Sequence, residues 1–207
     1  METSIPSVKE AIAALEAGAV VALPTETVYG LACDAQNPSA LAKLYDLKGR
    51  PANVPLPVAL AEASWAEGWQ REPQPAVERL ATRWWPGPLT IVVDAHDAVS
   101  TVVTAGLGTV ALRVPAQPLA LSVIQGLGRA VALTSANRHG EPPAQSAESV
   151  AEVFGAEVPV VVDGGPSTLG VPTTIVALGA DSSWRVLREG SVTAHELQSV
   201  LGVSPRS

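Results

Sequence analysis

The 207-residue chain is poor in the residues that form disulfides and protein-held metal sites, since Cys33 is its single cysteine. One cysteine excludes an internal disulfide and a cysteine-cluster metal site. The histidines are scattered at His96, His139 and His195, and no serine lies in a G-x-S-x-G turn that would expose a nucleophile. We therefore expect neither a hydrolytic triad nor a metal ion held by the protein.

The glycine motifs that bind phosphate in the common nucleotide-binding folds are also missing. The chain has no G-x-x-x-x-G-K-[ST] motif and no G-x-G-x-x-G motif after a strand. Gly106-Leu107-Gly108 lacks both the third glycine and a following helix. A P-loop protein and a dinucleotide-binding protein of the usual type are thus excluded.

Positive charge is scarce, with 13 Lys and Arg against 20 Asp and Glu and a net charge of −7. Because Lys9, Lys43 and Lys48 are the only lysines, the other ten cations are arginine. A protein that covers nucleic acid with its whole surface needs an excess of Lys and Arg, so this composition argues against one. A local basic pocket remains compatible with it.

Long apolar runs are absent as well. No segment approaches the roughly 18–20 apolar residues of a membrane helix. The N-terminus, METSIPSVKE, has no cationic segment followed by an apolar one, as a signal peptide would. We expect a soluble, cytoplasmic protein that does not associate with a membrane.

Hydrophobic residues make up 47% of the chain, and their periodicity predicts alternating helices and strands. Expected helices occupy residues 8–16, 38–48, 75–85, 117–125, 146–154 and 191–201, and expected strands occupy 19–23, 56–60, 89–93, 110–114, 130–134, 158–162, 174–178 and 184–187. Strands follow one another closely after Val158, which favours an α/β fold with a mixed parallel and antiparallel sheet. Pro57 favours an edge or irregular position for its strand. No linker or repeat is evident, so we expect one domain over 1–207.

Polar and charged residues cluster where apolar runs end. Thr25-Glu26-Thr27 follows the first expected strand, Lys48 and Arg50 flank one glycine, Arg113 ends an apolar run, and Ser135-Ala136-Asn137 follows another. Ligand-binding loops of α/β proteins lie at such strand ends. Arginine offers a fork and lysine a point charge to phosphate or carboxylate. The pattern therefore indicates an anion-binding site.

Each cluster also has a purely structural interpretation. Lys48 and Arg50 could form a solvent-exposed turn, and Arg113 could belong to a salt bridge, although no acidic partner is near it in sequence. Ser135 and Asn137 could cap the next element.

Five motifs occur in a characteristic order: PTETVYGL at 24–31, K-x-R-P at 48–51, WPGPLT at 85–90, VALRVP at 110–115 and S-A-N at 135–137. Their order and spacing resemble the YrdC-like family of threonylcarbamoyl-AMP synthases over about residues 11–190. The resemblance implies a twisted mixed sheet with flanking helices around a deep basic cavity. The chain resembles the short, single-domain type, with a C-terminal helix and tail at 191–207.

The resemblance also implies a nucleotidyltransferase reaction. L-threonine, bicarbonate and ATP would condense into L-threonylcarbamoyladenylate with release of pyrophosphate, for threonylcarbamoyladenosine modification of tRNA. Mg²⁺ would enter with ATP rather than in a protein metal site. The partners implied are the downstream tRNA threonylcarbamoyl-transfer machinery and, through weak direct binding, tRNA itself.

Family roles carry over to matching positions of this chain. Lys48 and Arg50 match the catalytic cations that bind the triphosphate. Further nucleotide-side positions are Thr109, Ser135, Asn137, Pro143 and Arg188. Threonine-side positions are Thr25, Tyr29, Arg113, Leu133 through its backbone, and Thr173. The chain departs from the family at Ala59, where longer members carry histidine, and around Thr173, where the flanking acidic residues are replaced by Pro172 and Ala177.

Two other functions are compatible with the same residues. A non-catalytic relative could hold RNA or nucleotide in the cavity, and a related domain could transfer a carbamoyl group to another acceptor. The local cations support the first alternative and the overall acidity opposes it. The second occurs in larger chains with zinc-finger and acylphosphatase-like parts.

Overall fold

The computed structural model describes residues 7–179, 181, 183–202 and 204–205. Across these residues, eight strands form one sheet in the order β1-β2-β6-β3-β5-β4-β7-β8. The strands are β1 (Val21–Leu23), β2 (Gly30–Asp34), β3 (Val58–Ala59), β4 (Leu89–Asp94), β5 (Thr109–Arg113), β6 (Val131–Ser135), β7 (Thr174–Leu178) and β8 (Trp184–Arg188). Neighbours are parallel at β3–β5 and β4–β7 and antiparallel at the other five pairs. The predicted α/β fold with a mixed sheet is confirmed.

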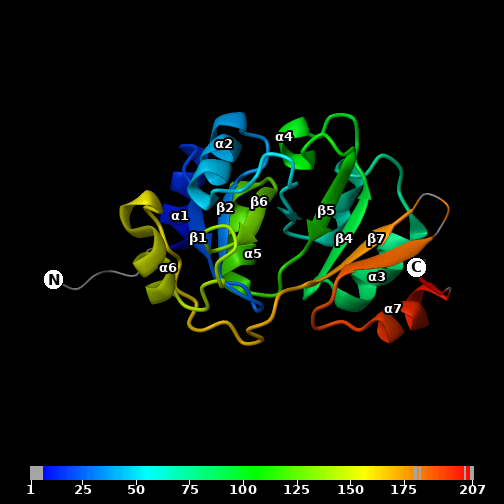
Figure 1. Cartoon of the computed structure of the whole chain (residues 1–207). Coiled ribbons are helices and arrows are strands. Elements are labelled where there is room, and N and C mark those ends of the chain that lie inside the picture. The colour runs from blue at the N-terminus through cyan, green and yellow to red at the C-terminus, as the bar shows by residue number, and fades with distance from the viewer. Residues whose placement is uncertain (1–6, 180, 182, 203, 206–207) are drawn as a thin grey trace.

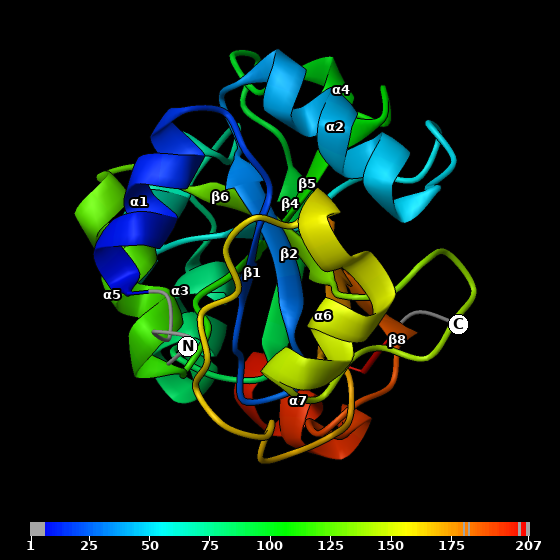
Figure 2. The same ribbon diagram turned by 90° about the vertical axis from the view of Figure 1, so that its left-hand side faces the viewer.

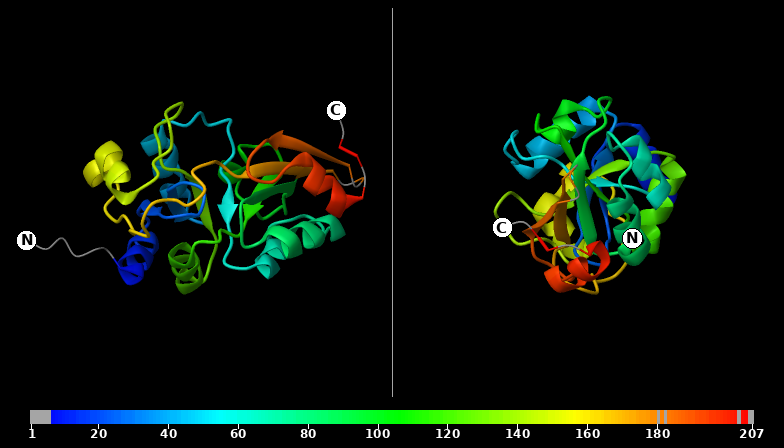
Figure 3. Two further views of the ribbon diagram at one scale, coloured as in Figure 1. Left: turned by 90° about the horizontal axis from the view of Figure 1, so that it is seen from below. Right: turned by 90° about the vertical axis from the view of Figure 1, so that its right-hand side faces the viewer.

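Helices flank this sheet. They are α1 (Val8–Glu16), α2 (Pro38–Lys48), α3 (Pro75–Trp84), α4 (Thr101–Thr104), α5 (Pro118–Leu127), α6 (Ala147–Phe154) and α7 (Ala194–Leu201), with the 3-10 turns η1 (Ala63–Gly68) and η2 (Gly155–Glu157). Figure 2 shows α1 and α5 on one side of β1 and β2 and α6 on the other. Helices α1 and α6 lie toward one end of the molecule, and β7, β8 and α7 lie toward the opposite end (Figures 1 and 3). None of the helices in the described ranges is long and apolar enough to cross a membrane.

Local sequence explains where several helices begin. Ser7, Ser146 and Thr193 each accept a hydrogen bond from a backbone N–H of the first turn and form a capping box with the third helical residue. Helix α2 begins with the predicted cap Asn37 and a proline at its first position. It ends at Gly49, whose φ of 62° suits the left-handed conformation that glycine adopts readily.

The sheet separates two apolar cores, because alternate residues of a strand face opposite sides. Val21 and Leu23 of β1 pack in the smaller core with Ile124 of α5. Ala22 faces the larger core, which also contains the fully buried Leu44 of α2. Both faces of the sheet are therefore covered.

Strand β2 was not expected from the sequence. Its residues, Gly30–Asp34, include glycine, alanine and aspartate, which have low β-propensity. All five are nevertheless buried, between β1 on one side and β6 on the other. Burial on both faces of the sheet therefore determines this strand despite the low β-propensity of its residues. The sequence pattern also gave no indication of α4 or η1.

An edge position for the strand after Pro57 and a strand at 158–162 were both expected, and neither is observed. Strand β3 lies inside the sheet between β5 and β6, and Pro57 only precedes it, offering its carbonyl oxygen to the Leu133 N–H at 2.9 Å. The segment 158–162 forms a single isolated bridge, Ala22 with Val161, instead of a strand. Two hydrogen bonds hold this bridge, from the Ala22 N–H to the Val160 carbonyl and from the Val162 N–H to the Ala22 carbonyl, each of 2.9 Å.

One buried hydroxyl ties the last helix to the sheet. Thr174 is fully buried in β7, and its Oγ1 donates to the Val192 carbonyl at 2.7 Å and accepts from the Val192 N–H at 2.9 Å. Val192 stands just before the cap of α7. This pair of bonds therefore anchors the start of the helix.

We predict that Thr174→Val lowers the free energy of unfolding, because both Val192 groups lose their partner while staying buried. The expected loss is about 1–3 kcal/mol for each unsatisfied group, measured by urea denaturation. Thr82→Val, at an exposed position of α3, is the matched control and should change stability by less than about 0.5 kcal/mol. Equal effects of the two substitutions would contradict the anchoring role.

Candidate active site

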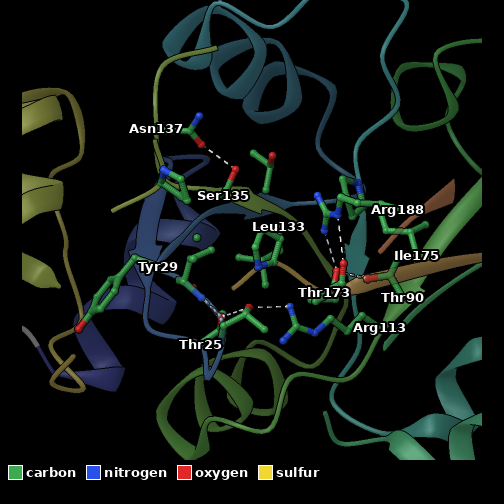
Figure 4. Close-up of a pocket in the computed structure, with 18 of the residues that line it drawn as sticks. Thr25, Tyr29, Thr90, Arg113, Leu133, Ser135, Asn137, Thr173, Ile175 and Arg188 are labelled. Atoms are coloured by element: carbon green, nitrogen blue, oxygen red, sulfur yellow. Dashed lines mark hydrogen bonds between the residues drawn. The ribbon is translucent and has the colours of Figure 1, made fainter. Parts of the chain in front are cut away.

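A cavity of about 290 Å³ lies where β5, β6 and β8 end and where β2, β4 and β7 begin. Figure 4 shows side chains from these strands converging on it. Among the described residues of its wall, the charged ones are Arg50, Arg113, Arg188 and Glu141. The wall is therefore predominantly positive, although the whole chain is acidic.

Arg50 faces the cavity without a carboxylate partner among the ion pairs of the described chain. Its Nε donates to the Val54 carbonyl at 3.0 Å and its Nη2 to the Pro55 carbonyl at 2.7 Å. Burial lowers the pKa of Arg50, and Tyr45 partly opposes this shift. Arginine stays charged in proteins, so this guanidinium keeps a full positive charge for a ligand.

Arg188, the last residue of β8, is held in a similar way. Its Nε donates to the Thr173 carbonyl at 3.0 Å and its Nη2 to Thr173 Oγ1 at 2.9 Å, and Thr90 Oγ1 lies 3.0 Å from the same hydroxyl (Figure 4). Burial and the positive charge of Arg113 both lower the pKa of Arg188. Two arginines that repel each other across a cavity favour an anion between them.

Arg113, the last residue of β5, has the salt bridge that sequence alone left open. Its Nη2 lies 2.6 Å from Glu26 Oε1, 87 residues away in sequence. Its Nε donates to the Gly87 carbonyl at 3.0 Å and its Nη1 to Thr27 Oγ1 at 3.3 Å. Burial lowers the pKa of Arg113, whereas the Glu26 carboxylate raises it. Arg113 thus lines the cavity as a fixed, partly neutralised cation.

Lys48 is 3% exposed at the end of α2 and lies behind the cavity wall. Its Nζ donates to the Ser135 carbonyl at 2.7 Å and to Asn137 Oδ1 at 2.8 Å, and it also lies 3.1 Å from the Asn137 carbonyl and 3.3 Å from Ser135 Oγ. Burial, followed by repulsion from Arg50, lowers the pKa of Lys48 to about 8. The ammonium organises the segment that contains both residues.

Ser135 and Asn137 do not cap a helix, as one interpretation of the sequence suggested. Ser135 Oγ donates to Asn137 Oδ1 at 2.6 Å, and Asn137 Nδ2 donates to the carbonyls of Arg138 and Glu141 at 2.8 and 2.7 Å. Both residues line the cavity, as does Pro143. The predicted nucleotide-side residues of this segment therefore meet in one wall.

The Thr25 hydroxyl is the centre of a tight turn at the other end of the cavity. It donates to the Val28 carbonyl at 2.5 Å and accepts from the Thr27 and Val28 N–H groups at 3.2 Å each. Thr25 Oγ1 also lies 2.8 Å from Thr27 Oγ1, the atom that accepts from Arg113. This chain of bonds connects the turn to the guanidinium.

Tyr29 belongs to the wall through its backbone, while its ring points away from the cavity (Figure 4). The phenol donates to the Gly165 carbonyl at 2.9 Å and accepts from the Gly164 N–H at 3.1 Å. Burial raises the pKa of Tyr29. The side chain anchors the turn at 163–165 and offers no hydroxyl to a cavity ligand.

Thr109 lies outside the cavity wall, contrary to its predicted nucleotide-side position. It is the first residue of β5 and pairs with Asp94, whereas Arg113 is the last. Four residues of strand separate the two by about 13 Å, so a site at the Arg113 end does not include Thr109. Leu133 does line the cavity, but its N–H already bonds to the Pro57 carbonyl at 2.9 Å. Its side chain is therefore more available to a ligand than its N–H.

Most of the positions that depart from the family pattern also lie in the wall, although Ala177 does not. Ala59, Pro172 and Thr173 line the cavity, and Thr173 is the residue that holds Arg188. Sequence reasoning did not assign Thr90 or Glu141 to the site. A single hydroxyl in the apolar strand 89–93 was the available signal for Thr90, but nothing comparable marked Glu141.

Among the described residues, no group of three or more His, Cys, Asp or Glu side chains is placed so that it could hold a metal ion. The arrangement instead offers cations, hydroxyls and amide groups. Such a set suits a ligand with several negatively charged oxygens.

Residues 13–190 match the Sua5/YciO/YrdC family, whose description reads "Telomere recombination". The chain belongs to this family. Over 203 residues it is 41% identical to the threonylcarbamoyl-AMP synthase of Bacillus subtilis (strain 168), a match that covers 98% of this chain and 58% of that protein. It is 35% identical over 184 residues to the threonylcarbamoyl-AMP synthase of Vibrio parahaemolyticus, covering 88% of this chain and 98% of that protein.

The crystal structure of P. abyssi Sua5 complexed with L-threonine matches with a TM-score of 0.91 and 38% identity. The match covers 96% of this chain and 58% of that one. The chain therefore spans little more than half the length of the B. subtilis and P. abyssi relatives. The resemblance inferred from the five motifs is confirmed at the level of family and fold.

Lys48 makes a pH-dependent contribution to stability. Its pKa is about 8 in the folded chain and near its ordinary value of 10.5 when unfolded, so the unfolded chain binds more protons between these values. Stability from this group therefore rises as pH increases from about 8 to 10.5. We define the difference as the free energy of unfolding of the wild type minus that of Lys48→Met. We predict that this difference becomes more positive over this range, by at most about 1.4 kcal/mol per pH unit.

Denaturant titrations at several pH values measure that difference. Cys33, whose pKa burial raises to about 12, and Tyr29 titrate in both proteins, so their effects cancel. A difference that stays constant or shrinks with pH would show that Lys48 is not a depressed cation.

Proposed function

We propose that this chain is an L-threonylcarbamoyladenylate synthase, a nucleotidyltransferase that condenses L-threonine, bicarbonate and ATP and releases pyrophosphate. The observation that carries the proposal is the convergence of Arg50, Arg113 and Arg188 on one cavity in a member of this family. The synthase relatives in B. subtilis and V. parahaemolyticus and the threonine complex of P. abyssi Sua5 support it.

The reaction joins several anions, so positioning and electrostatic stabilisation would supply most of the catalysis. A carbamate oxygen of N-carboxy-threonine attacks the α-phosphorus of ATP, and the bond from that phosphorus to the β-phosphate oxygen breaks to release pyrophosphate. Arg50 would neutralise charge on the phosphates, and Lys48 would hold Ser135 and Asn137 against the nucleotide. No covalent enzyme intermediate is required.

The amino acid would bind at the end of the cavity formed by the Thr25 turn and Arg113. The guanidinium offers N–H groups to the threonine carboxylate, and Thr173 lies on the same side with Arg188. The nucleotide would bind toward Arg50, Ser135, Asn137 and Pro143. Both substrates would thus meet between the two groups of residues.

Several parts of the proposal concern molecules outside the chain. Mg²⁺ would arrive with ATP, and bicarbonate would supply the carbamate carbon. The adenylate would pass to the tRNA threonylcarbamoyl-transfer machinery, with tRNA itself bound weakly if at all. A cytoplasmic location suits all of these partners.

Pyrophosphate release tests the function directly. Purified chain with ATP, L-threonine, bicarbonate and Mg²⁺ should release pyrophosphate and form the adenylate, and omission of either threonine or bicarbonate should stop both. An intact protein that binds ATP but forms no threonine-dependent product would contradict the proposal. Salt-dependent tRNA binding without adenylate formation would instead favour the non-catalytic alternative.

Arg113→Ala should impair use of threonine far more than binding of ATP. Loss of a buried, charged hydrogen-bond partner costs about 2 kcal/mol or more, which corresponds to a KM for threonine at least about 30-fold higher. Arg71→Ala is the matched control, since Arg71 is exposed and pairs with Asp97 away from the cavity. Equal losses in threonine and ATP affinity would argue against the role assigned to Arg113.

A further inference from the structure

Glu26 connects three separate segments beside the cavity. Its Oε1 lies 2.6 Å from Arg113 Nη2, and its Oε2 accepts from the Ala116 N–H at 3.1 Å. Its backbone carbonyl accepts from the Leu169 N–H at 2.8 Å and from Thr168 Oγ1 at 3.3 Å. The residue therefore joins the first turn, the end of β5 and the segment before β7.

The ion pair leaves part of the arginine free. A guanidinium has five N–H donors, and Arg113 uses one each toward Gly87, Thr27 and Glu26, so two donors remain. One of these remaining donors is on Nη1 and the other on Nη2, and a carboxylate can accept hydrogen bonds from two nitrogens of one arginine. Glu26 therefore does not need to leave for a ligand carboxylate to bind.

Glu26 is itself held too firmly to act as a displaceable lid. The exposed fractions of the two side chains are 12% for Glu26 and 11% for Arg113, and the Ala116 N–H fixes the second carboxylate oxygen. Removing the carboxylate would leave the buried guanidinium without a counter-charge and held only by the Gly87 carbonyl and the Thr27 hydroxyl, so that it could turn toward solvent in the cavity. The orientation of Arg113 thus depends on Glu26.

We infer that Glu26 is a positioning residue for amino-acid recognition: it fixes the Arg113 guanidinium so that its two remaining donors face the substrate carboxylate. This inference rests on the proposed synthase function. Glu26 acts through Arg113 and lies outside the cavity wall, so it does not touch the nucleotide. Substitution of Glu26 should therefore weaken the use of the amino acid and leave the use of ATP unchanged.

The test uses Glu26→Gln in the whole chain, which preserves the size and backbone of the residue and removes its charge. The KM for L-threonine should rise by about ten-fold or more, while the KM for ATP stays within about two-fold of the wild type. Glu26→Asp keeps the charge and should recover part of the loss in threonine KM.

Asp34→Asn is a closely matched control. The Asp34 carboxylate also binds one arginine, Arg129 at 2.7 Å, and one backbone N–H, that of Gln36 at 2.9 Å, and it lies outside the cavity wall. A substitution there removes a comparable ion pair without touching Arg113. It should leave both KM values within about two-fold of the wild type.

A second measurement does not depend on activity. In ¹⁵N NMR spectra, the Arg113 Nε–H should exchange slowly with water in the wild type and faster in Glu26→Gln. The Leu169 amide, which bonds to the retained backbone carbonyl, should keep its protection.

The outcomes distinguish a failure of the proposed synthase function from a failure of the positioning role of Glu26. A wild type without threonine-dependent pyrophosphate release contradicts the proposed function, whereas an Arg113 Nε–H that stays protected in Glu26→Gln overturns the positioning role whatever the activity. Parallel rises in both KM values, or tighter threonine binding because Glu26 had competed with the substrate, would also overturn it.

Discussion

Positive charge held by neutral oxygens is the constraint on which the cavity depends. A buried charge is costly unless its hydrogen bonds are satisfied. Carbonyl, hydroxyl and amide oxygens accept hydrogen bonds from the buried Lys48 and from the more accessible Arg50 and Arg188 without cancelling their charge. Carboxylates in the same places would be more favourable for folding alone. The chain thus retains an attraction for anions that a set of salt bridges would remove.

The sheet is what brings these oxygens to the cations. Lys48 comes from the end of α2, whereas its acceptors are the last residue of β6, Ser135, and Asn137 just after it, 87 and 89 residues later. Thr173 precedes β7 and holds Arg188 at the end of β8, because the two strands are paired. Strand pairing fixes the backbone groups before any ligand arrives. Polar groups fixed in this way need little reorganisation during a reaction, which is the basis of electrostatic catalysis.

The sequence predicted which residues line the cavity better than it predicted the contacts between them. Arg50, Arg113 and Asn137 stand after apolar runs, and strand ends do meet at the cavity. The partner of Arg113 could not be found locally, since Glu26 lies 87 residues away in the turn between β1 and β2 and only the folded sheet brings that turn to the end of β5. Strand β2 was missed because burial, not propensity, determines it. Thr109 lies outside the cavity wall because a motif gives order along the chain, whereas a strand keeps its first and last residues far apart.

The two ends of the cavity hold their cations in different ways, and this difference fits two different ligands. At the Thr25 end, the Glu26 carboxylate fixes the Arg113 guanidinium and the Thr173 oxygens fix Arg188, so that end offers oriented N–H groups to a single carboxylate such as that of an amino acid. At the other end, Arg50 has no carboxylate partner among the described ion pairs, and Lys48 adds charge behind the wall. A triphosphate carries several negative charges and needs such an excess. A cavity without these unpaired cations could still hold an amino acid through oriented hydrogen bonds, but it would lack the charge that a triphosphate requires.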